Sequence, residues 1–422
     1  MSAQNLTEVD DPLLSAADPV AAAREDVARG ALVEAPAGRV GLELEFHLVL
    51  LAEPTRRPTW TEVVTAVDAL PAMPGGSTVS VEPGGQVELS TPPADDVVGA
   101  VAALRADERA LREGLAPSGL GAAALGTDPA RPVARVNPAG RYRAMERHFD
   151  AVGCGPAGRA MMSATAALQV NLDAGPRAGW RDRMRLLDTL VPVLVAISAT
   201  SPWLAGRPSG WHSARRRTWL GIDPGRSGPV GHRPDRSPVD AWASYVLAAP
   251  VMLDRLRMVP VTSRTPFAAW LTGDATDPAL VRRPTTADLD YHLTTLFPPV
   301  RPRGYVELRC LDALPARWWP ALVALTVTLA DDPVAADRAT EVCEPLAGRE
   351  LTAARHGLAD PAVRSAVHDC VGTALARCPA ELEPDLDRLA TLLDAGRTPG
   401  DELRRRVAAV GPVRMMEEEA HG

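Results

Sequence analysis

Glutamate and amide side chains recur at every second position in four short stretches of the chain. The stretches cover residues 40–48, 79–90, 164–173 and 305–310. Successive side chains of a β-strand leave opposite faces, so this alternation predicts strands with one apolar and one polar face. In the first stretch, Glu43 and Glu45 share the polar face, about 7 Å apart because a strand rises about 3.3 Å per residue. The pattern therefore predicts a sheet with a chemically active face.

The other three stretches add polar groups to that face. Pro83-Gly84-Gly85 separates two alternating runs and predicts a β-hairpin, which places Glu82 and Glu88 on the same face. The third and fourth stretches contribute Thr165, Gln169, Asn171, Asp173, Glu307 and Arg309. If these strands form one sheet, five glutamates converge beside several amide and guanidinium groups.

A divalent cation is the simplest reason for such a face. Like charges at close range repel by several kcal/mol unless a cation neutralises them. The alternative is a solvated surface, which is the usual explanation for a single alternating strand. A solvated strand face normally mixes Thr, Lys and Arg with Glu, however, and these four faces carry mostly Glu, Gln and Asn. Oxygen ligands suit Mg²⁺ or Mn²⁺ better than zinc or copper.

Composition excludes several classes of protein. The chain has 422 residues, 46% of them hydrophobic, and a net charge of -8, which predicts a globular protein and argues against a nucleic-acid partner. All 45 basic residues are arginine, because the sequence contains no lysine. A Walker-A loop and a Schiff-base enzyme both need a lysine, so both are excluded. Phosphate must be held by arginine, backbone amides or metal.

The cysteines and the apolar runs predict a cytoplasmic protein. The five cysteines form no C-x-x-C pair and are typical of reduced thiols. The N-terminus does not resemble a signal peptide, and the apolar run 190–199 contains Pro192 and is too short to span a membrane. We therefore expect no membrane partner, and a monomer or a small homo-oligomer.

The order of elements predicts an α+β fold. We expect a curved, mainly antiparallel sheet flanked by helices, because strands and helices do not alternate as in βαβ units. Residues 1–35 are expected to be a flexible or helical segment, 36–330 a catalytic domain, and 331–422 a helical section packed on the same unit. Apolar spacing predicts helices at 60–70, 97–115, 181–198, 239–256, 318–329, 362–377, 384–395 and 404–410. The Gly/Pro/Arg-rich region 205–238 is expected to be a functional loop.

A carboxylate face with metal ions and arginines points to phosphoryl transfer from a nucleotide. Metal ions bridge phosphate oxygens and neutralise the charge of the transition state. Arg309 shares a strand face with Glu307, and Arg215 and Arg226 lie in the 205–238 region. These three arginines are the candidates for binding anionic groups.

Seven sequence blocks follow one another over about residues 38–315. They are Gly-Leu-Glu-Leu-Glu (41–45), Glu-Pro-Gly-Gly-Gln-Val-Glu-Leu-Ser (82–90), Gly-Arg-Tyr-x-x-Met (140–145), Met-Met-x-x-Thr-x-x-x-Gln-Val-Asn-Leu-Asp (161–173), Trp-x-x-x-Asp-x-x-Arg (219–226), His-Leu-Thr-Thr-Leu-Phe-Pro (292–298) and Tyr-Val-Glu-Leu-Arg (305–309). In this order the blocks resemble the glutamate-cysteine ligases. Within that family the chain looks most like the bacterial enzymes of the ergothioneine pathway, which have a glutamine-synthetase-like catalytic sheet. Relatives in the glutathione pathway carry an arginine in the Met-Met-x-x-Thr block, where this chain has Ser163 and Ala164.

The resemblance implies a reaction and a set of site residues. ATP phosphorylates the γ-carboxylate of glutamate, and the amine of cysteine attacks the acyl phosphate to give γ-glutamylcysteine, ADP and phosphate. The family's metal positions, for two or three Mg²⁺ ions with Mn²⁺ as a substitute, fall on Glu43, Glu45, Glu82, Glu88, Gln169 and Glu307. The resemblance implies catalytic roles for Glu307 and Arg309, and contacts to ATP for Arg309 and Thr165. The residues expected to bind the amino-acid substrates are Arg141, Tyr142, Asn171, Arg215 and Arg226.

Two other functions remain open from the residues alone. A γ-glutamyl ligase with a different small amine as acceptor would use the same metal and ATP groups. A guanidino phosphotransferase has a similar sheet and moves phosphate without forming an amide. A ligase releases orthophosphate and a kinase does not, so the products distinguish the two classes.

Overall fold

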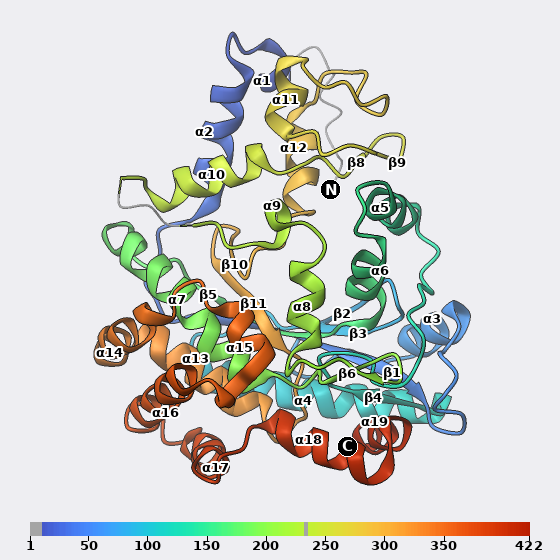
Figure 1. The fold of residues 1–422 in the computed structure, drawn as a ribbon, viewed down its shortest axis with the longest axis vertical. Helices are drawn as coiled ribbons and strands as arrows, with labels where there is room; N and C mark the ends of the chain where they lie inside the picture. The colour runs from blue at the N-terminus through green and yellow to red at the C-terminus, as the bar shows by residue number, and fades with distance from the viewer. Residues whose placement is uncertain (1–10, 232–234) are drawn as a thin grey trace.

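A seven-stranded antiparallel sheet lies at the centre of the computed structural model, which describes residues 11–231 and 235–422 (Figure 1). The strand order is β10-β11-β5-β1-β3-β2, and β4 pairs with the far half of β1. The strands are β1 (Val40–Leu50), β2 (Thr78–Val81), β3 (Val87–Ser90), β4 (Leu120–Ala123), β5 (Ala167–Leu172), β10 (Val300–Pro302) and β11 (Val306–Asp312). Two short hairpins lie outside this sheet, β6 (Trp203–Leu204) with β7 (Arg207–Pro208) and β8 (Leu253–Asp254) with β9 (Val259–Pro260).

The register of the sheet confirms the predicted two faces. Glu43 pairs with Gln169 across β1 and β5, and Glu45 pairs with Glu88 across β1 and β3. On the opposite face, apolar side chains of the same strands, such as Leu42, Leu44 and Phe46, are fully buried. All four alternating stretches therefore contribute to a single sheet, with their polar groups on one side of it.

Helices cover the sheet and complete the α+β class predicted from the sequence. Helices α4, α7 and α13 contact the sheet strands, and the large apolar cluster joins these helices to the apolar face. The helices are α1 (Pro12–Ser15), α2 (Pro19–Ala31), α3 (Trp60–Asp68), α4 (Val97–Leu115), α5 (Gly140–Ala151), α6 (Gly155–Ala164), α7 (Trp180–Ser198), α8 (Ala214–Leu220), α9 (Pro224–Ser227), α10 (Pro238–Ala248), α11 (Phe267–Thr272), α12 (Thr286–Leu293), α13 (Trp319–Asp331), α14 (Pro333–Cys343), α15 (Glu350–His356), α16 (Pro361–Leu375), α17 (Glu383–Asp394), α18 (Pro399–Val410) and α19 (Pro412–His421).

Helices α2, α10, α11 and α12 form a separate layer at one end of the molecule (Figure 1). Helix α2 packs against α10 and α11, although more than 200 residues separate α2 from α10 in the sequence. We call this layer the cap. The described part of the predicted N-terminal segment thus contains α1 and α2, of which α2 belongs to the cap, and residues 1–10 of that prediction lie outside the described residues.

Two predictions about local structure are wrong. The helix predicted over 239–256 ends at Ala248, because Pro250 lacks the amide hydrogen that a longer helix needs. The region 205–238, predicted to be a loop, contains helices α8 and α9.

The residues beyond Asp331 are helical. Helices α14 and α16 pack against α13 and α7, and α19 packs against β4. No helix within the described residues is both long and apolar enough to cross a membrane. The predicted boundaries of the three sections remain a prediction.

Candidate active site

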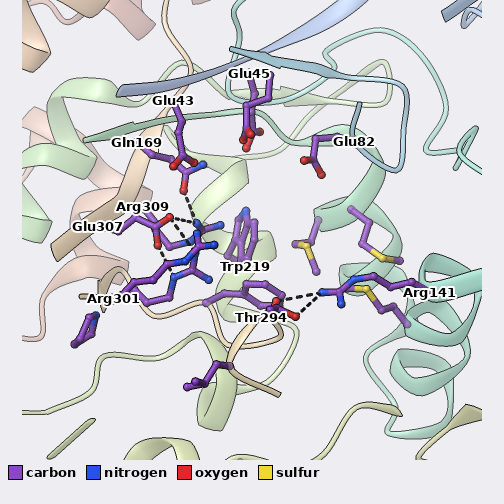
Figure 2. A pocket seen from close by; sticks show the side chains of 18 of the residues that line it. Glu43, Glu45, Glu82, Arg141, Gln169, Trp219, Thr294, Arg301, Glu307 and Arg309 are labelled. Atoms are coloured by element: carbon purple, nitrogen blue, oxygen red, sulfur yellow. Dashed lines mark hydrogen bonds and ion pairs between the residues drawn. The ribbon is translucent and has the colours of Figure 1, made fainter. Parts of the chain in front are cut away.

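A cavity of about 760 Å³ lies between the polar face of the sheet and the helices α5, α6 and α8, with the cap at its other side. Figure 2 shows Glu43 and Glu45 pointing into it from β1, Glu82 from the turn after β2, and Arg141 entering from the opposite wall. The volume is in the usual range for small-molecule sites. The predicted site residues that line it are Glu43, Glu45, Glu82, Glu88, Arg141, Tyr142, Thr165, Gln169, Glu307 and Arg309.

Backbone and side-chain donors orient the carboxylates of the sheet. Glu43 accepts a hydrogen bond of 3.0 Å from the Asn171 amide, so Asn171 orients a carboxylate and does not line the cavity. Glu45 accepts a hydrogen bond of 2.9 Å from the backbone amide of Ala167. Glu88 accepts hydrogen bonds from the hydroxyl of Ser80 (3.2 Å) and from a second serine hydroxyl on its own strand (3.0 Å).

The electrostatics of these carboxylates suit a cation. Burial, followed by repulsion from Glu307 and Glu88, raises the pKa of Glu43 from 4.5 to about 7. Burial and Glu88 raise the pKa of Glu82 to about 7, and the pKa of Glu45 is raised well above 4.5 by the same two causes. Three half-buried carboxylates with raised pKa values are a donor set whose charge is not neutralised by the protein. The glutamate face therefore fits a hard divalent cation with oxygen ligands.

Glu307 is different, because two arginines neutralise it. Its carboxylate accepts hydrogen bonds of 2.9 Å from both Arg301 and Arg309. Burial raises the pKa of Glu307, but the two guanidinium groups outweigh burial and hold that pKa below its usual range. Arg309 also donates to the side-chain oxygen of Gln169. One guanidinium therefore connects two of the predicted metal ligands.

The carboxylates are not gathered into a compact metal cluster. Among the residues that the structure describes, no group of three or more His, Cys, Asp or Glu side chains has metal-binding spacing. The glutamates surround the cavity from different strands, and arginines hold Glu307 and Gln169. Binding of metal at all six predicted positions therefore requires these side chains to turn toward the ions.

The wall opposite the sheet is aromatic and apolar. Trp219 and Phe297 pack edge to face with ring centres 5.2 Å apart, beside methionines from α5 and α6. Arg141 donates hydrogen bonds to the carbonyl (3.2 Å) and hydroxyl (3.1 Å) of Thr294, and burial beside Glu82 raises the pKa of Tyr142 to about 12. The cavity thus joins a charged floor to a wall that can take the apolar parts of a ligand.

Comparison with known proteins decides which family has this site. The sequence model of the glutamate-cysteine ligase family 2 matches residues 39–422. The chain belongs to this family. The resemblance stated from the sequence blocks is confirmed.

Two relatives that share half of their aligned residues with the chain come from mycobacteria. The chain is 50% identical over 397 residues to the glutamate-cysteine ligase EgtA of Mycolicibacterium smegmatis, covering 94% of this chain and 93% of that protein. It is 50% identical over 395 residues to EgtA of Mycobacterium tuberculosis, covering 92% and 91%. The chloroplastic glutamate-cysteine ligase of Medicago truncatula is 30% identical over 289 residues, covering 67% of this chain and 56% of that protein.

A solved structure of a more distant ligase has the same fold. The crystal structure of the glutamate-cysteine ligase from Francisella tularensis in complex with AMP matches with a TM-score of 0.53 at 14% identity. The match covers 92% of this chain and 88% of that one. At this identity the likeness shows the fold alone.

Two of the predicted substrate-binding arginines lie outside the cavity. Arg226 is fully buried, and its guanidinium donates to the carbonyls of Thr295 (2.7 Å) and Pro250. The structure therefore does not bring Arg226 to the site, because α9 turns it inward to bind backbone carbonyls. Arg215 is buried behind Trp219, 5.7 Å from its ring centre, and donates to the backbone carbonyl of Arg309 (2.9 Å). Arg215 supports a cavity residue and does not itself line the cavity.

The sequence did not identify Arg301 as a site residue. It lies on the three-residue strand β10, pairs with Glu307 and donates a hydrogen bond of 3.0 Å to the carbonyl of Leu296. This strand could not be predicted from the sequence, because the prolines at 299 and 302 interrupt the alternating pattern from which the other strands were predicted. The cap residues Asp26 and Arg29 also line the cavity, and no pattern in the sequence links them to the sheet.

Proposed function

We propose that this protein is an ATP-dependent ligase that joins the γ-carboxylate of L-glutamate to the amine of L-cysteine. The products are γ-glutamylcysteine, ADP and phosphate, and the proposed use of the product is ergothioneine biosynthesis. The observation that carries this proposal is the glutamate face of the cavity in a chain half identical, over nearly its whole length, to ligases named EgtA.

The chemistry of the reaction fits the groups that line the cavity. A carboxylate is a poor acyl donor, and phosphorylation by ATP turns one of its oxygens into a leaving group. The amine of cysteine then attacks the acyl carbon, the new C–N bond replaces the C–O bond to phosphate, and the amine loses a proton. Bound divalent ions neutralise the phosphate charge that grows during the transfer. ATP as the phosphoryl donor is supported by family membership.

The residue roles in this proposal follow from position. Two or three Mg²⁺ ions, or Mn²⁺ in their place, are assigned to Glu43, Glu45, Glu82, Glu88, Gln169 and Glu307. Arg309 lies on the same face and is assigned to the transferred phosphate, where a fixed guanidinium is worth roughly a factor of 10² to 10³ in rate. Thr165 is assigned to the nucleotide, and Arg141 and Tyr142, on the opposite wall, to the amino-acid substrates.

The position of each arginine limits its role. Arg215 acts through Arg309, since its guanidinium binds the Arg309 carbonyl. Arg226 is not assigned to substrate, because its guanidinium faces backbone carbonyls. We also propose that the protein is cytoplasmic and that its partners are small molecules, as a soluble amino-acid ligase requires.

An acceptor panel tests the proposed reaction. Purified protein is incubated with ATP, Mg²⁺ and glutamate, either alone or with cysteine, serine, alanine, glycine or 2-aminobutyrate, and ADP, phosphate and the dipeptide are measured. We expect cysteine to give the fastest turnover, with ADP, phosphate and γ-glutamylcysteine in equal amounts. ADP without phosphate would indicate a kinase, and a faster reaction with another amine would replace cysteine as the acceptor.

Substitution of one proposed metal ligand tests the glutamate face, and substitution of an exposed glutamate is its control. Glu43→Ala should abolish ADP formation and leave the far-UV circular dichroism spectrum of the protein unchanged. Glu381→Ala, an exposed glutamate beyond the sheet, should retain full turnover. Full activity of Glu43→Ala would contradict the assignment of the glutamate face.

A further inference from the structure

A buried ion-pair cluster lies next to the glutamate face, and none of its three members lines the cavity. Asp128 is fully buried, and its carboxylate accepts hydrogen bonds of 2.8 Å from the guanidinium groups of both Arg57 and Arg131. It also accepts from the backbone amides of Ala130 (3.1 Å) and Arg131 (2.9 Å). The removal of three charged side chains from water is costly, so the cluster calls for an explanation beyond packing.

Arg131 connects Asp128 to the strand that carries the first two glutamates. Its guanidinium donates a hydrogen bond of 2.7 Å to the carbonyl of Leu48, which lies on β1 three residues after Glu45. Arg131 is almost fully buried, so this contact is shielded from water. The position of β1 is therefore linked directly to Asp128.

Arg57 connects Asp128 to the hairpin that carries the next two glutamates. Its guanidinium donates a hydrogen bond of 3.2 Å to the carbonyl of Gly84, in the turn between β2 and β3. The turn starts at Glu82, whose backbone amide donates a hydrogen bond of 2.8 Å to the backbone carbonyl of Gln86. Glu88 follows on β3. The position of the hairpin is therefore linked to the same carboxylate.

The backbone of Asp128 makes a third connection. Its amide donates a hydrogen bond of 2.9 Å to the carbonyl of Ala164, directly before Thr165 and the strand that carries Gln169. Asp128 thus contacts or connects to all three segments that supply Glu43, Glu45, Glu82, Glu88 and Gln169. The two hydrogen-bonded arginines keep it ionised, since their charges outweigh burial and lower the pKa of Asp128.

We infer that Asp128, through Arg57 and Arg131, is a positioning residue that fixes the distance between the hairpin β2–β3 and the strand β1. The inference rests on the proposed function, because the groups whose spacing is fixed are the proposed metal ligands. Metal affinity depends steeply on such supporting contacts, and loss of one typically weakens metal binding by about 10- to 100-fold.

Two variants remove the connection by different routes. Asp128→Asn keeps the size of the side chain and removes its charge, and Arg57→Met keeps an unbranched chain of similar length and removes the hydrogen bond to Gly84. The matched control is Asp254→Asn on β8, because Asp254 is also fully buried and binds two arginines, Arg257 (2.7 Å) and Arg282 (3.0 Å). Asp254 does not line the cavity.

The first measurement is the affinity for Mn²⁺ in the presence of ADP. Electron paramagnetic resonance detects the Mn²⁺ that stays free in solution, so the measurement needs no turnover. We expect the Kd for Mn²⁺ to rise at least about tenfold in Asp128→Asn and Arg57→Met and to stay within twofold of wild type in Asp254→Asn. If Asp128→Asn does not fold, Arg57→Met decides. Wild-type affinity in Arg57→Met, or an equal loss in Asp254→Asn, would overturn the inference.

The second measurement is hydrogen–deuterium exchange of the peptide that covers residues 78–90, which does not depend on the proposed function. We expect its amides to exchange at least tenfold faster in Arg57→Met than in wild type or Asp254→Asn. Unchanged exchange would overturn the inference even if the ligase assay succeeds. Failure of the wild-type protein to bind Mn²⁺ would overturn the proposed metal face and with it the inference. Faster exchange of the hairpin in Arg57→Met would still show the structural connection in that case.

Discussion

Glu43 and Glu82 line the cavity, and a bound divalent ion would change the protonation of their carboxylates. Each has its pKa raised from 4.5 to about 7, with burial as the largest cause and neighbouring glutamates next. An acid with a raised pKa in the folded chain favours folding while it is protonated. That contribution is present below about pH 4.5 and is lost as the pH rises through about 7. A divalent ion reverses this loss by stabilising the ionised carboxylates.

The pH dependence gives a prediction at the scale of single residues. We expect Mg²⁺ to raise the Tm of the wild-type protein more at pH 8 than at pH 6. Glu82→Gln should raise the Tm of the metal-free protein at pH 8 and leave it nearly unchanged at pH 5, because it removes a charge that is costly only when ionised. Differential scanning fluorimetry measures both effects. The exposed Glu381→Gln is the control, and equal effects of Mg²⁺ at the two pH values would contradict the prediction.

The hairpin β2–β3 is the element on which the geometry of the face depends most. A Cβ atom added at Gly84 would lie 2.3 Å from the backbone oxygen of Ser163, a contact that the chain can relieve only by moving the turn or α6. Gln86 holds the same segments together, because its amide donates to the carbonyl of Thr165 (2.8 Å). The hairpin therefore has little freedom to shift without displacing Glu82.

Gly84→Ala tests this constraint. We expect it to destabilise the protein by about 1–3 kcal/mol, the usual cost of overpacking, and to lower turnover more than tenfold by moving the hairpin. Gly372→Ala on α16 is the control, since nothing lies within 4 Å of the added methyl group; it should stabilise by up to about 1 kcal/mol. Urea denaturation and the ADP assay measure the two effects. Wild-type stability of Gly84→Ala would show that the turn is not constrained.

The elements that could be predicted from the sequence are those in which apolar residues recur at the spacing of a strand or a helix without interruption. Strand β1 alternates from Leu42 to Leu48, and α4 is predicted to the residue, so the polar face and the helices behind it follow from side-chain direction alone. Strand β10 has three residues and a proline, so Arg301 has no pattern to mark it. Arg301 was missed, whereas Arg226 was expected at the site and lies outside it. The sequence does not distinguish a guanidinium that faces a ligand from one that binds buried carbonyls.

At the scale of the whole molecule, one apolar core joins the catalytic sheet to the helices that follow it. The large cluster of buried apolar residues runs from Leu13 on α1 to Leu393 on α17. Helix α19 is held against α4 by Arg112, which donates to the carbonyl of Glu419 (3.2 Å). These contacts support the prediction that residues 331–422 fold as part of the same unit as the sheet.

Unfolding of the full chain tests whether it forms a single unit. All nine tryptophans lie between residues 60 and 319, so tryptophan fluorescence reports on the part of the chain before the C-terminal helices. Circular dichroism at 222 nm reports on all helices, including those after residue 331. We expect the two urea transitions to coincide, as for a cooperative unit. An earlier transition in circular dichroism alone would show that the C-terminal section unfolds separately.

The central claim is that the glutamate face supports amide synthesis through an acyl phosphate, and oxygen transfer tests it most directly. Glutamate labelled with ¹⁸O in its γ-carboxylate is incubated with the protein, ATP, Mg²⁺ and cysteine, and phosphate and dipeptide are analysed by mass spectrometry. The account predicts one ¹⁸O atom in each phosphate and one in each γ-glutamylcysteine, because the phosphorylated carboxylate oxygen leaves with the phosphate. Phosphate without label, or ADP formation without dipeptide, would contradict it.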